Sequence, residues 1–468
     1  MQRLETDYLV IGSGAISMAF VDTMLDQSDA TFVIVDKHHM PGGHWNDAYS
    51  FVRLHQPSAL YGVASTELGS GRIDESGPNK GYLELASGPE ISAYFEKVMT
   101  ERLLASGRVT YLPMHEYTQA GKVRSLLGIE EYQVTIRKKL VDGTFFNTSV
   151  PSTHTRKYDV AQNVTCIAPN ELPKIAHQFS HYVILGGGKT AMDAAVWLLT
   201  HNASSDALTW VCPRDSWLIN RATTQPGGYF FKRTAGAVAK QFQAMIDAQS
   251  VEDVFLKLEE AGNMLRVDKS VMPTMFHYAT ISEGELEHLS NIKHIIRNER
   301  VAALSEAGMT MTNNATHAMP ENTLYIDCTA TAAVFTGQRT QPVFSEDRLI
   351  LQATYAPLVT YSAAIIAFVE ANYDDIEQKN ALCMPVQLAD SPMEWLISTS
   401  QNMMNQHKWN QDKDLRAWLN ACRLNPSYAA FKDNAMADPA NAQLLKGIAE
   451  LIRPALGNAQ KLLQMHKP

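Results

Sequence analysis

Two stretches of the chain share one order of apolar, glycine and helical positions. Residues 8–11 and 182–185 are unbroken apolar runs, and each is followed by closely spaced glycines and then by a helical pattern. A strand that helices cover on both faces is apolar throughout, whereas a half-exposed strand alternates apolar and polar residues. The repeat therefore predicts an α/β protein with two Rossmann-type, doubly wound units.

The remaining apolar runs predict how the two units are connected. Buried strands are expected at residues 31–36, 208–212 and 325–329. The last of these lies where the chain would return to the first unit, so we interpret the second unit as an insertion in the first. The predicted divisions are a first dinucleotide-binding domain (1–175), an inserted second one (176–325), a return segment of the first (326–385) and a helical C-terminal appendage (386–468).

Helix-start signals mark two helical regions. Ser87-Gly-Pro-Glu90 is a capping box with proline in the first turn, and apolar residues follow at helical spacing, so a helix is predicted over residues 89–104. Ser391-Pro-Met-Glu394 is a second capping box, and it opens the C-terminal region in which apolar residues line helical faces. This region carries no chemical motif.

A β-hairpin is predicted between residues 132 and 148. The pair Asp142-Gly143 suits a tight turn, and runs rich in β-branched and aromatic residues lie on its two sides. We therefore expect a small accessory antiparallel sheet in this part of the chain.

Composition and charge exclude several classes of function. The chain has 468 residues, of which 45% are hydrophobic and 19% charged, as in globular rather than disordered proteins. Its 40 basic and 49 acidic residues give a net charge of −9, so nucleic acid is not an expected partner. The five cysteines lie far apart in sequence, which favours reduced thiols and excludes a C-x-x-C pair.

The sequence also predicts a location in the cell. The first strand begins near residue 7, which leaves no room for a signal sequence, and the longest membrane candidate, residues 358–369, falls short of the roughly 18 residues needed. We therefore expect a cytoplasmic protein with no membrane partner. The sequence is compatible with a homo-oligomer but does not define the oligomeric state.

The two glycine turns match dinucleotide-binding loops. In such a loop the first glycine permits the turn, the second lets the backbone approach a pyrophosphate, and the third lets helix and strand pack closely. The helix N-terminus then faces the phosphates. These positions are filled by Gly12, Gly14 and Ser17 in the first unit and by Gly186, Gly188 and Ala191 in the second. The alternative is that the glycines only permit packing.

The residue that ends the next strand of each unit indicates the type of ribose. Asp36 can accept hydrogen bonds from both ribose hydroxyls and would repel a 2′-phosphate, so FAD or NAD fits the first unit. Arg214 is first in line in the second unit and suggests NADP, because a guanidinium pairs bidentately with phosphate. Lys189 and Thr190 begin the following helix, where Lys189 would add positive charge. Alternatively, Arg214 is a surface residue paired with Asp215 and Lys189 is solvated.

Two further segments resemble the flavin-containing monooxygenases and their class B flavoprotein relatives. They are Pro41-Gly-Gly-His-Trp45 and Arg53-Leu-His-Gln-Pro57, and the resemblance runs from about residue 7 to residue 369. It implies that the first unit binds FAD and that the inserted unit binds NADPH. By the same resemblance, the residues near the flavin ring are Gly42, Gly43, His44 and Trp45, with His55 or Gln56 at its reactive edge.

The chain departs from the motifs of this family in two places. A Phe-x-Gly-x-x-x-His fingerprint usually precedes the second glycine loop, but residues 168–180 lack it. The Ala-Thr-Gly turns that usually link the domains are also absent, and residues 165–167 and 327–330 stand in their place. The cofactors are therefore better supported than oxygen transfer, and attack on nitrogen, sulfur or ketone carbon stays open.

The function that the resemblance implies is that of an FAD-dependent, NADPH-reduced monooxygenase. Reduced flavin would react with O2 to give a C4a-(hydro)peroxide, which transfers one oxygen atom to a small organic substrate. Residues 358–366 are expected to begin with capping residues and to aim a helix N-terminus at the flavin, the alternative being an ordinary buried helix. The rival functions are an NAD(P)H-dependent flavin reductase or oxidase and a non-catalytic flavoprotein that serves as an interaction platform.

No metal site is predicted. His38, His39 and His44 lie close together in sequence, but no carboxylate or thiol completes a ligand set among them. The glycines between these histidines favour a loop that covers a cofactor.

Overall fold

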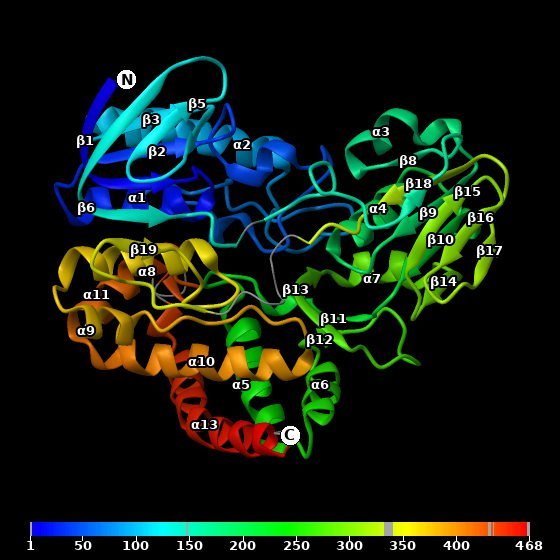
Figure 1. The fold of residues 1–468 in the computed structure, drawn as a ribbon. Coiled ribbons are helices and arrows are strands. Elements are labelled where there is room, and N and C mark those ends of the chain that lie inside the picture. Colours follow the sequence, from blue (N-terminus) through cyan, green and yellow to red (C-terminus); the bar gives the residue numbers. More distant parts are fainter. Residues whose placement is uncertain (1, 147, 332–339, 429–431, 434, 466–468) are drawn as a thin grey trace.

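The computed structural model describes residues 2–146, 148–331, 340–428, 432–433 and 435–465. Residues 332–339 of the predicted return segment therefore lie outside the described part. Two α/β units lie side by side, and a layer of helices runs along one side of both (Figure 1). Among the described residues, no helix is both long and apolar enough to cross a membrane.

The first unit is built on a seven-stranded sheet. Its strands are β1 (Gln2–Ile11), β2 (Phe32–Asp36), β3 (Val109–Pro113), β4 (His115–Tyr117), β5 (Lys122–Ser125), β6 (Glu131–Asp142) and β19 (Arg348–Ile350). Their order is β3-β2-β1-β6-β5-β4, and β19 also pairs with β6. Strand β1 is central and pairs in parallel with both β2 and β6, as its unbroken apolar run predicts.

The predicted hairpin at Asp142-Gly143 is wrong. Residues 139–142 of β6 pair in parallel with residues 8–11 of β1, so the chain continues through the sheet instead of turning back. The Gly143 N–H then donates to the Ile11 carbonyl at 3.0 Å. Antiparallel pairing lies upstream, between β4 and β5 and between β5 and β6. The accessory antiparallel strands are thus an extension of the first sheet.

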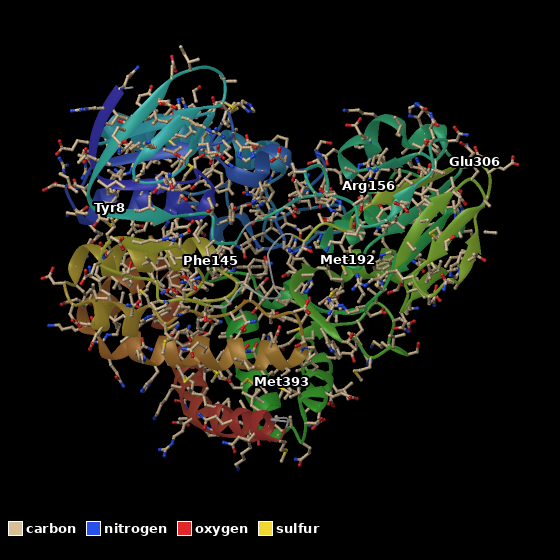
Figure 2. All side chains as sticks on the ribbon, viewed as in Figure 1. Tyr8, Phe145, Arg156, Met192, Glu306 and Met393 are labelled. Atoms are coloured by element: carbon tan, nitrogen blue, oxygen red, sulfur yellow. The ribbon has the colours of Figure 1, made fainter. Side chains whose placement is uncertain are left out.

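Two long helices form the apolar layer on one face of the first sheet. Helices α1 (Ala15–Gln27) and α8 (Val359–Asn372) pack against each other there. Helix α8 is apolar on almost every side and buried along most of its length. Figure 2 labels Tyr8 where the sheet meets α8, and the Tyr8 hydroxyl donates to Glu370 of α8 at 3.0 Å. The sequence-distant α8 is therefore part of the core of the first unit.

The helix predicted over residues 89–104 is confirmed. Helix α2 (Gly88–Lys97) begins with the complete capping box of Ser87 and Glu90, and a π-helical turn, Val98–Leu103, continues it. Helix α9 (Ile376–Leu382) follows α8 in the chain, and the Asp375 side chain caps it.

The second unit is built on a five-stranded parallel sheet. Its strands are β8 (Cys166–Ile167), β9 (His181–Leu185), β10 (Leu208–Cys212), β14 (His294–Arg297) and β18 (Thr323–Asp327). Their order is β14-β10-β9-β18-β8. The expected α/β class, with two units based on parallel strands, is therefore confirmed. Because β8 belongs to this sheet, the second unit takes in strands before residue 176.

Helices and a small sheet cover the two faces of the second sheet. Helices α3 (Leu172–Ile175), α4 (Lys189–Thr200) and α7 (Glu283–Ser290) pack on one face. The other face is covered by a four-stranded sheet of β7 (Asp159–Val160), β15 (Val301–Ser305), β16 (Gly308–Met311) and β17 (Thr316–Ala318).

The C-terminal region is helical, as predicted, but it is not a separate appendage. Its helices are α10 (Pro392–Gln411), α11 (Lys413–Ala421) and α13 (Pro439–Gln464). They pack against α8 and against a part of the insertion made of β11 (Ser216–Asn220), β12 (Met264–Leu265), β13 (Met275–Ile281), α5 (Phe231–Asp247) and α6 (Val251–Glu260). Helix α13 therefore contributes to one hydrophobic core together with the helices of the insertion.

Candidate functional site

The first glycine loop leaves the start of α1 open. Gly12 adopts φ +90°, which favours glycine, and its N–H donates to the Val35 carbonyl at 2.8 Å. Gly14 is the residue before α1, and a Cβ atom on it would meet only the Gly43 Cα atom, at 3.8 Å. No side chain caps α1, so its first N–H groups keep their hydrogen-bonding capacity for an anion.

The second glycine loop has the same character. Gly186 adopts φ +125° and packs against the Cys328 carbonyl, while a Cβ atom on Gly188 would meet nothing within 4 Å. Gly188 precedes α4, which also lacks a side-chain cap. Ala191 is fully buried, and Thr190 hydrogen-bonds Tyr49 of the first unit. The third-position alanine thus packs helix against strand, as the motif requires.

A missing cap distinguishes α1 and α4 only together with the glycine that precedes each of them. Ser or Asp side chains accept hydrogen bonds at the starts of α2, α6, α7, α9, α10, α11 and α13. Such a cap is missing from α1 and α4, and also from α3, α5 and α8. The prediction that residues 358–366 begin with capping residues is wrong, because Leu358 precedes α8 and no side chain caps it. The Ser362 hydroxyl donates to the Leu358 carbonyl at 2.9 Å and accepts from the Tyr355 N–H at 3.0 Å, which lies before the helix.

Asp36 ends β2 beside the first glycine loop. Its carboxylate accepts from the Ser13 N–H at 2.5 Å, the Ser13 hydroxyl at 2.8 Å and the His38 N–H at 2.7 Å, and it also bonds the His38 Nδ1 at 2.9 Å. Burial raises the pKa of Asp36, but the hydrogen bonds to His38 and Ser13 outweigh it and lower that pKa overall. A ribose hydroxyl would take the place of one of these bonds, and the Ser13 hydroxyl has Tyr111 as another partner at 3.2 Å.

His38 is a charged bridge that sequence reasoning missed. Its Nδ1 contacts Asp36 and its Nε2 contacts Asp47, each at 2.9 Å. The hydrogen bond to Asp36 and the second carboxylate raise the pKa of His38 to about 9, although burial opposes the shift. The ring is therefore an imidazolium at neutral pH.

No group of three or more potential metal ligands occurs among the described residues.

The loop over residues 41–45 lies directly on the first glycine loop. Gly42 and Gly43 adopt φ +112° and +59°, and the Gly42 N–H donates to the Ser13 carbonyl at 2.9 Å. The Trp45 indole donates to the Tyr61 hydroxyl at 2.8 Å, which fixes the ring. Burial lowers the pKa of His44 to about 4, so this ring is neutral. The structure therefore places this predicted flavin-side segment beside Gly14.

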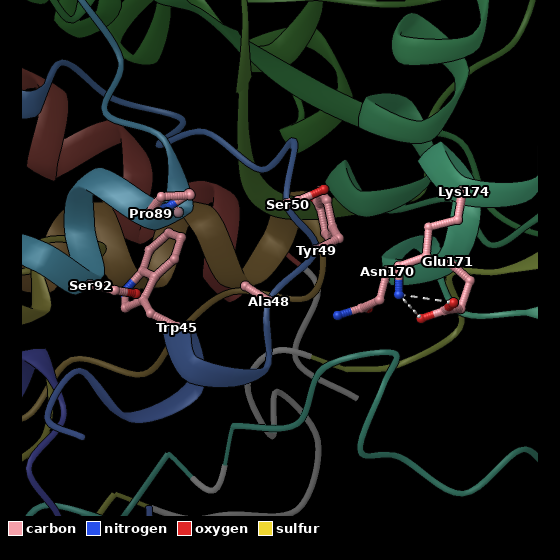
Figure 3. Close-up of a pocket in the computed structure, with 10 residues that line it drawn as sticks. Trp45, Ala48, Tyr49, Ser50, Pro89, Ser92, Asn170, Glu171 and Lys174 are labelled. Atoms are coloured by element: carbon pink, nitrogen blue, oxygen red, sulfur yellow. Dashed lines mark hydrogen bonds and ion pairs between the residues drawn. The ribbon is translucent and has the colours of Figure 1, made fainter. Parts of the chain in front are cut away.

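A cleft of about 440 Å³ lies between the two units (Figure 3). Figure 3 shows Trp45 and Pro89 on the side of the first unit, and Asn170, Glu171 and Lys174 on the opposite side. Trp45, the last residue of the predicted flavin-side segment, thus also lines the cleft. A cavity of this size suits a small organic molecule, for which pockets of roughly 300–1,000 Å³ are typical.

His55 lies at the junction of the units, whereas Gln56 bonds within its own turn. The His55 carbonyl accepts from the Arg221 Nε at 2.9 Å. Burial, followed by the charges of Lys189 and Arg221, lowers the pKa of His55 to about 3, so its ring is neutral. The Gln56 amide donates to the Leu60 carbonyl at 3.4 Å.

Lys189 is neither solvated nor free to receive a 2′-phosphate. Its buried ammonium pairs with Asp193 and, at 3.1 Å, with Glu285 of α7. The Tyr49 hydroxyl of the first unit donates to Asp193 at 2.7 Å. The positive charge expected for a phosphate is thus already matched by two carboxylates of the chain itself.

Arg221 and Glu285 extend this network. Glu285 completes the Ser282–Glu285 capping box of α7, but the sequence carries no local signal for its pairing with Arg221. Arg221 is 1% exposed and pairs with Glu285, and it donates to the Thr280 carbonyl at 3.0 Å. Burial raises the pKa of Glu285, but the Lys189 and Arg221 charges hold it well below its usual range. Because Arg221 also binds the backbone of His55, the network fastens the second unit to the first.

Arg214 stands at the end of β10 but is not paired with Asp215. Its Nη1 and Nη2 donate to the two carboxylate oxygens of Asp390, at 3.1 and 3.2 Å. Asp215 instead accepts from Arg297 at 3.0 Å. The Nε2 of His277 hydrogen-bonds the same Asp390 carboxylate. Arg214 thus lies just after β10, and its guanidinium is held by an acidic residue from the start of the C-terminal region.

Comparison with other proteins gives both sequence relatives and structural neighbours. No family model matches the chain. The uncharacterized protein Rv2000 of Mycobacterium tuberculosis (strain ATCC 25618 / H37Rv) is 45% identical over 425 residues, covering 91% of this chain and 78% of that protein. The uncharacterized protein Mb2023 of Mycobacterium bovis matches to the same extent.

The solved structures that match include flavin monooxygenases at low sequence identity. The open crystal structure of cyclohexanone monooxygenase covers 96% of this chain and 99% of its own, with a TM-score of 0.50 and 13% identity. A flavin-containing monooxygenase from Stenotrophomonas maltophilia covers 81% of this chain and 99% of its own at 14% identity, with a TM-score of 0.45. Oxidized steroid monooxygenase bound to NADP covers 78% and 85% at 13% identity, with a TM-score of 0.48. The expected resemblance to class B flavoproteins is therefore confirmed at the level of fold.

Proposed function

From the premise that the chain belongs to the same family as these mycobacterial proteins and has the fold of cyclohexanone monooxygenase, we propose that it is an FAD-dependent, NADPH-reduced monooxygenase. The reaction consumes NADPH, a proton, O2 and a small organic substrate, and it yields NADP, water and the substrate with one added oxygen atom. Fold alone does not decide the activity, so the proposal rests on the residues of the site.

The observation that carries the proposal is the pair of open helix starts behind the two glycine loops. Both α1 and α4 begin without a side-chain cap, directly after a glycine whose Cβ direction is clear. The unpaired N–H groups and partial positive charge of such a start suit a diphosphate. Two such starts in one chain support two dinucleotides.

The residues around the first loop fit FAD. Gly12, Gly14 and the start of α1 would hold the diphosphate, and Asp36 would accept from the adenosine ribose. The contact between Gly43 and Gly14 brings the segment that ends in Trp45 to the same edge of the sheet. The two cations next to Asp36 in the chain already have carboxylate partners, since Lys37 pairs with Glu116 at 2.7 Å and His38 lies between Asp36 and Asp47.

The residues around the second loop fit NADPH. Gly188 and the start of α4 would hold the diphosphate, and Arg214 at the end of β10 would bind the 2′-phosphate. Lys189 contributes by fixing the start of α4 to α7 through Asp193 and Glu285, rather than by contacting the ligand.

When bound, FAD supplies the redox chemistry, namely electron transfer from a reduced nicotinamide and activation of dioxygen. The chain's own residues orient the reactants and limit access of water. Trp45, fixed by Tyr61, lines the cleft on the side of the first unit. His55 is neutral, because burial and the charges of Lys189 and Arg221 disfavour its protonation, so it can orient a polar atom by a hydrogen bond.

An NAD(P)H-dependent flavin oxidase is the second candidate function. The cleft between the units is bordered by the exposed residues Glu171 and Lys174, so it is open to solvent on that side. Water in the cleft favours release of hydrogen peroxide over transfer of oxygen to a substrate. The missing fingerprint before the second glycine loop supports the same alternative.

Oxygen-isotope labelling separates the two candidates. FAD-loaded protein is supplied with NADPH and labelled O2 in the presence of a panel of small ketones, sulfides and amines. The proposal predicts a product with one labelled oxygen atom and a yield of hydrogen peroxide lower than in the absence of substrate. Recovery of all NADPH electrons as hydrogen peroxide, whatever the substrate, would contradict it and favour the oxidase.

A further inference from the structure

Three side chains from distant parts of the sequence meet at the carboxyl end of β10 in the second sheet. Arg214 follows β10, His277 lies in β13, and Asp390 precedes α10. The Asp390 carboxylate accepts two hydrogen bonds from Arg214, at 3.1 and 3.2 Å, and a third contact joins it to the Nε2 of His277. The Asp390 carboxylate therefore takes up the hydrogen-bond donors of Arg214 and His277 that an anionic ligand would otherwise use.

The backbone of Asp390 is fixed, so the carboxylate cannot leave by a simple loop movement. Its carbonyl accepts from the Phe276 N–H at 3.2 Å, and its N–H donates to Glu394 at 2.6 Å. The next residue, Ser391, caps α10. With the Asp390 backbone fixed, the pair separates by rotation of one of its two side chains, and Arg214 is 37% exposed and so within reach of a ligand.

The charges at this edge do not favour a second anion while Asp390 keeps its place. Asp390 matches the charge of Arg214, and Asp215 and Asp268 match that of the neighbouring Arg297. Burial raises the pKa of Asp390, but Arg214 and His277 lower it overall, so Asp390 is ionised. A phosphate bound by Arg214 would lie a few ångström from this carboxylate, and like charges at that distance repel. Removing the carboxylate would leave Arg214 with an unmatched positive charge.

We propose that Asp390 is a specificity-determining residue that competes with the 2′-phosphate of NADPH for Arg214. This competition weakens NADPH binding but not NADH binding, and so lowers the preference for NADPH over NADH. The inference deepens the proposed function, because it rests on Arg214 being the phosphate-binding residue of the second unit. Asp390 acts here as an internal anion supplied by the C-terminal region. Asp390 lies far from the second glycine loop in sequence, so the sequence of that loop does not indicate its role.

The test compares two nucleotides that differ only in the 2′-phosphate. Binding of 2′,5′-ADP and of 5′-AMP is measured calorimetrically, at fixed ionic strength, on the FAD-loaded full chain as wild type and as Asp390→Asn. The expected result is a gain of roughly tenfold or more for 2′,5′-ADP, equal to about 1.4 kcal/mol, with 5′-AMP changed by less than about twofold. Equal changes for both nucleotides, a loss for 2′,5′-ADP, or no binding of it to the variant would overturn the proposal.

Two further variants give the test its controls. Asp206→Asn removes the same charge from an ion pair with Lys293 just before β10, on the opposite edge of the same sheet, and should leave both affinities unchanged. Arg214→Ala combined with Asp390→Asn should abolish the gain, because the two residues act on each other. If Asp390→Asn lowers the melting temperature markedly, Asp390→Ala replaces it in the same comparison, and the absence of a gain in a folded variant overturns the proposal.

The outcome can be separated from the fate of the proposed function. The two probes carry no nicotinamide, so their binding does not depend on flavin reduction or on oxygen transfer. The proposed function instead fails when the wild-type protein gives no oxygenated product. A selective gain of 2′,5′-ADP binding together with full recovery of hydrogen peroxide would support the role of Asp390 in an oxidase.

Discussion

A Cβ atom on Gly43 would lie only 3.0 Å from the Cα atom of Gly14, so the two glycine-bearing loops of the first unit are in direct backbone contact. The Gly42 N–H strengthens this contact by donating to Ser13. The first glycine turn and the segment that leads to Trp45 therefore hold each other in place. In the proposed function, this contact brings the diphosphate-binding turn and the Trp45 ring to the same end of the first sheet.

Replacement of Gly14 by valine is expected to remove flavin while leaving the fold intact. Gly14 has φ −71°, which any residue adopts, and its Cβ would make only an ordinary contact. The branched side chain would instead occupy the space that the pyrophosphate needs. FAD affinity, measured by flavin fluorescence on reconstitution, should fall at least tenfold, or about 1.4 kcal/mol.

The matched control for this prediction is Gly236→Val. Gly236 lies in α5, away from both loops, and a Cβ atom there would meet nothing within 4 Å. This variant should bind FAD as the wild type does. Full flavin occupancy in the Gly14→Val protein would show that the pyrophosphate does not approach this turn.

Arg214→Ala is expected to discriminate between the two nicotinamide cofactors. Loss of a charge-assisted hydrogen bond to the 2′-phosphate costs about 1.5–3 kcal/mol, or roughly 10- to 150-fold in NADPH affinity. NADH has no such phosphate and should be nearly unaffected. Dissociation constants for both cofactors are compared in the same variant, and equal losses would mean that Arg214 acts only through its ion pair with Asp390.

Lys189→Met is expected to behave differently from Arg214→Ala. The Lys189 ammonium is buried between Asp193 and Glu285, so the substitution disturbs the start of α4 rather than a phosphate contact. NADPH and NADH should therefore lose affinity by the same factor. A selective loss of NADPH in the binding measurement would show that Lys189 changes partners and reaches the 2′-phosphate.

The glycine loops could be predicted from the sequence because the residues that define them are close together along the chain. Gly12, Gly14 and Asp36 belong to one strand–helix–strand unit, and the capping box before α2 spans only four residues. Local sterics and local hydrogen bonds decide such features. The structure accordingly has the predicted strands, turns and helix starts at these positions.

The features that were missed depend on residues far apart in sequence. The pair Asp142-Gly143 suits a hairpin, yet pairing of β6 with β1 keeps this part of the chain in the parallel sheet. Asp390 lies 176 positions from Arg214, and no local pattern connects an acidic residue before α10 with the end of β10. Tertiary pairing therefore overrode a local turn preference in one case and supplied an unforeseen anion in the other.

The His38 bridge predicts a stability difference that depends on pH. The folded-state pKa of about 9 lies above the ordinary value of 6.5, so the stabilisation is complete below pH 6.5 and is lost as the pH rises through about 9. His38→Gln should therefore lower the melting temperature most near pH 6 and least near pH 10, at the ends of roughly that window. Melting curves across this range provide the measurement.

His39→Gln is the control for the His38 prediction. His39 is exposed on the same loop, so its replacement should change the melting temperature little at any pH. A difference between His38→Gln and the wild type that is constant from neutral to alkaline pH would mean that the bridge to Asp36 and Asp47 carries no net charge effect.

Glu285→Gln is expected to destabilise the junction of the two units. Arg221 is almost fully buried, and the variant would leave its charge without a carboxylate, at a cost of about 3–5 kcal/mol. Urea unfolding at neutral pH measures this free energy. Glu171→Gln, which breaks an exposed pair with Lys174, should cost no more than about 1 kcal/mol, and a similar small cost for Glu285→Gln would refute the role of the network.

The central claim, that the two glycine loops bind FAD and NADPH in one reductive site, is tested most directly by anaerobic titration. The purified, FAD-loaded protein is titrated with NADPH while the visible absorbance of the flavin is followed. The account predicts a yellow protein whose flavin band disappears as one equivalent of NADPH is added. A protein that cannot be loaded with FAD, or a bound flavin that stays oxidised in excess NADPH, would contradict it.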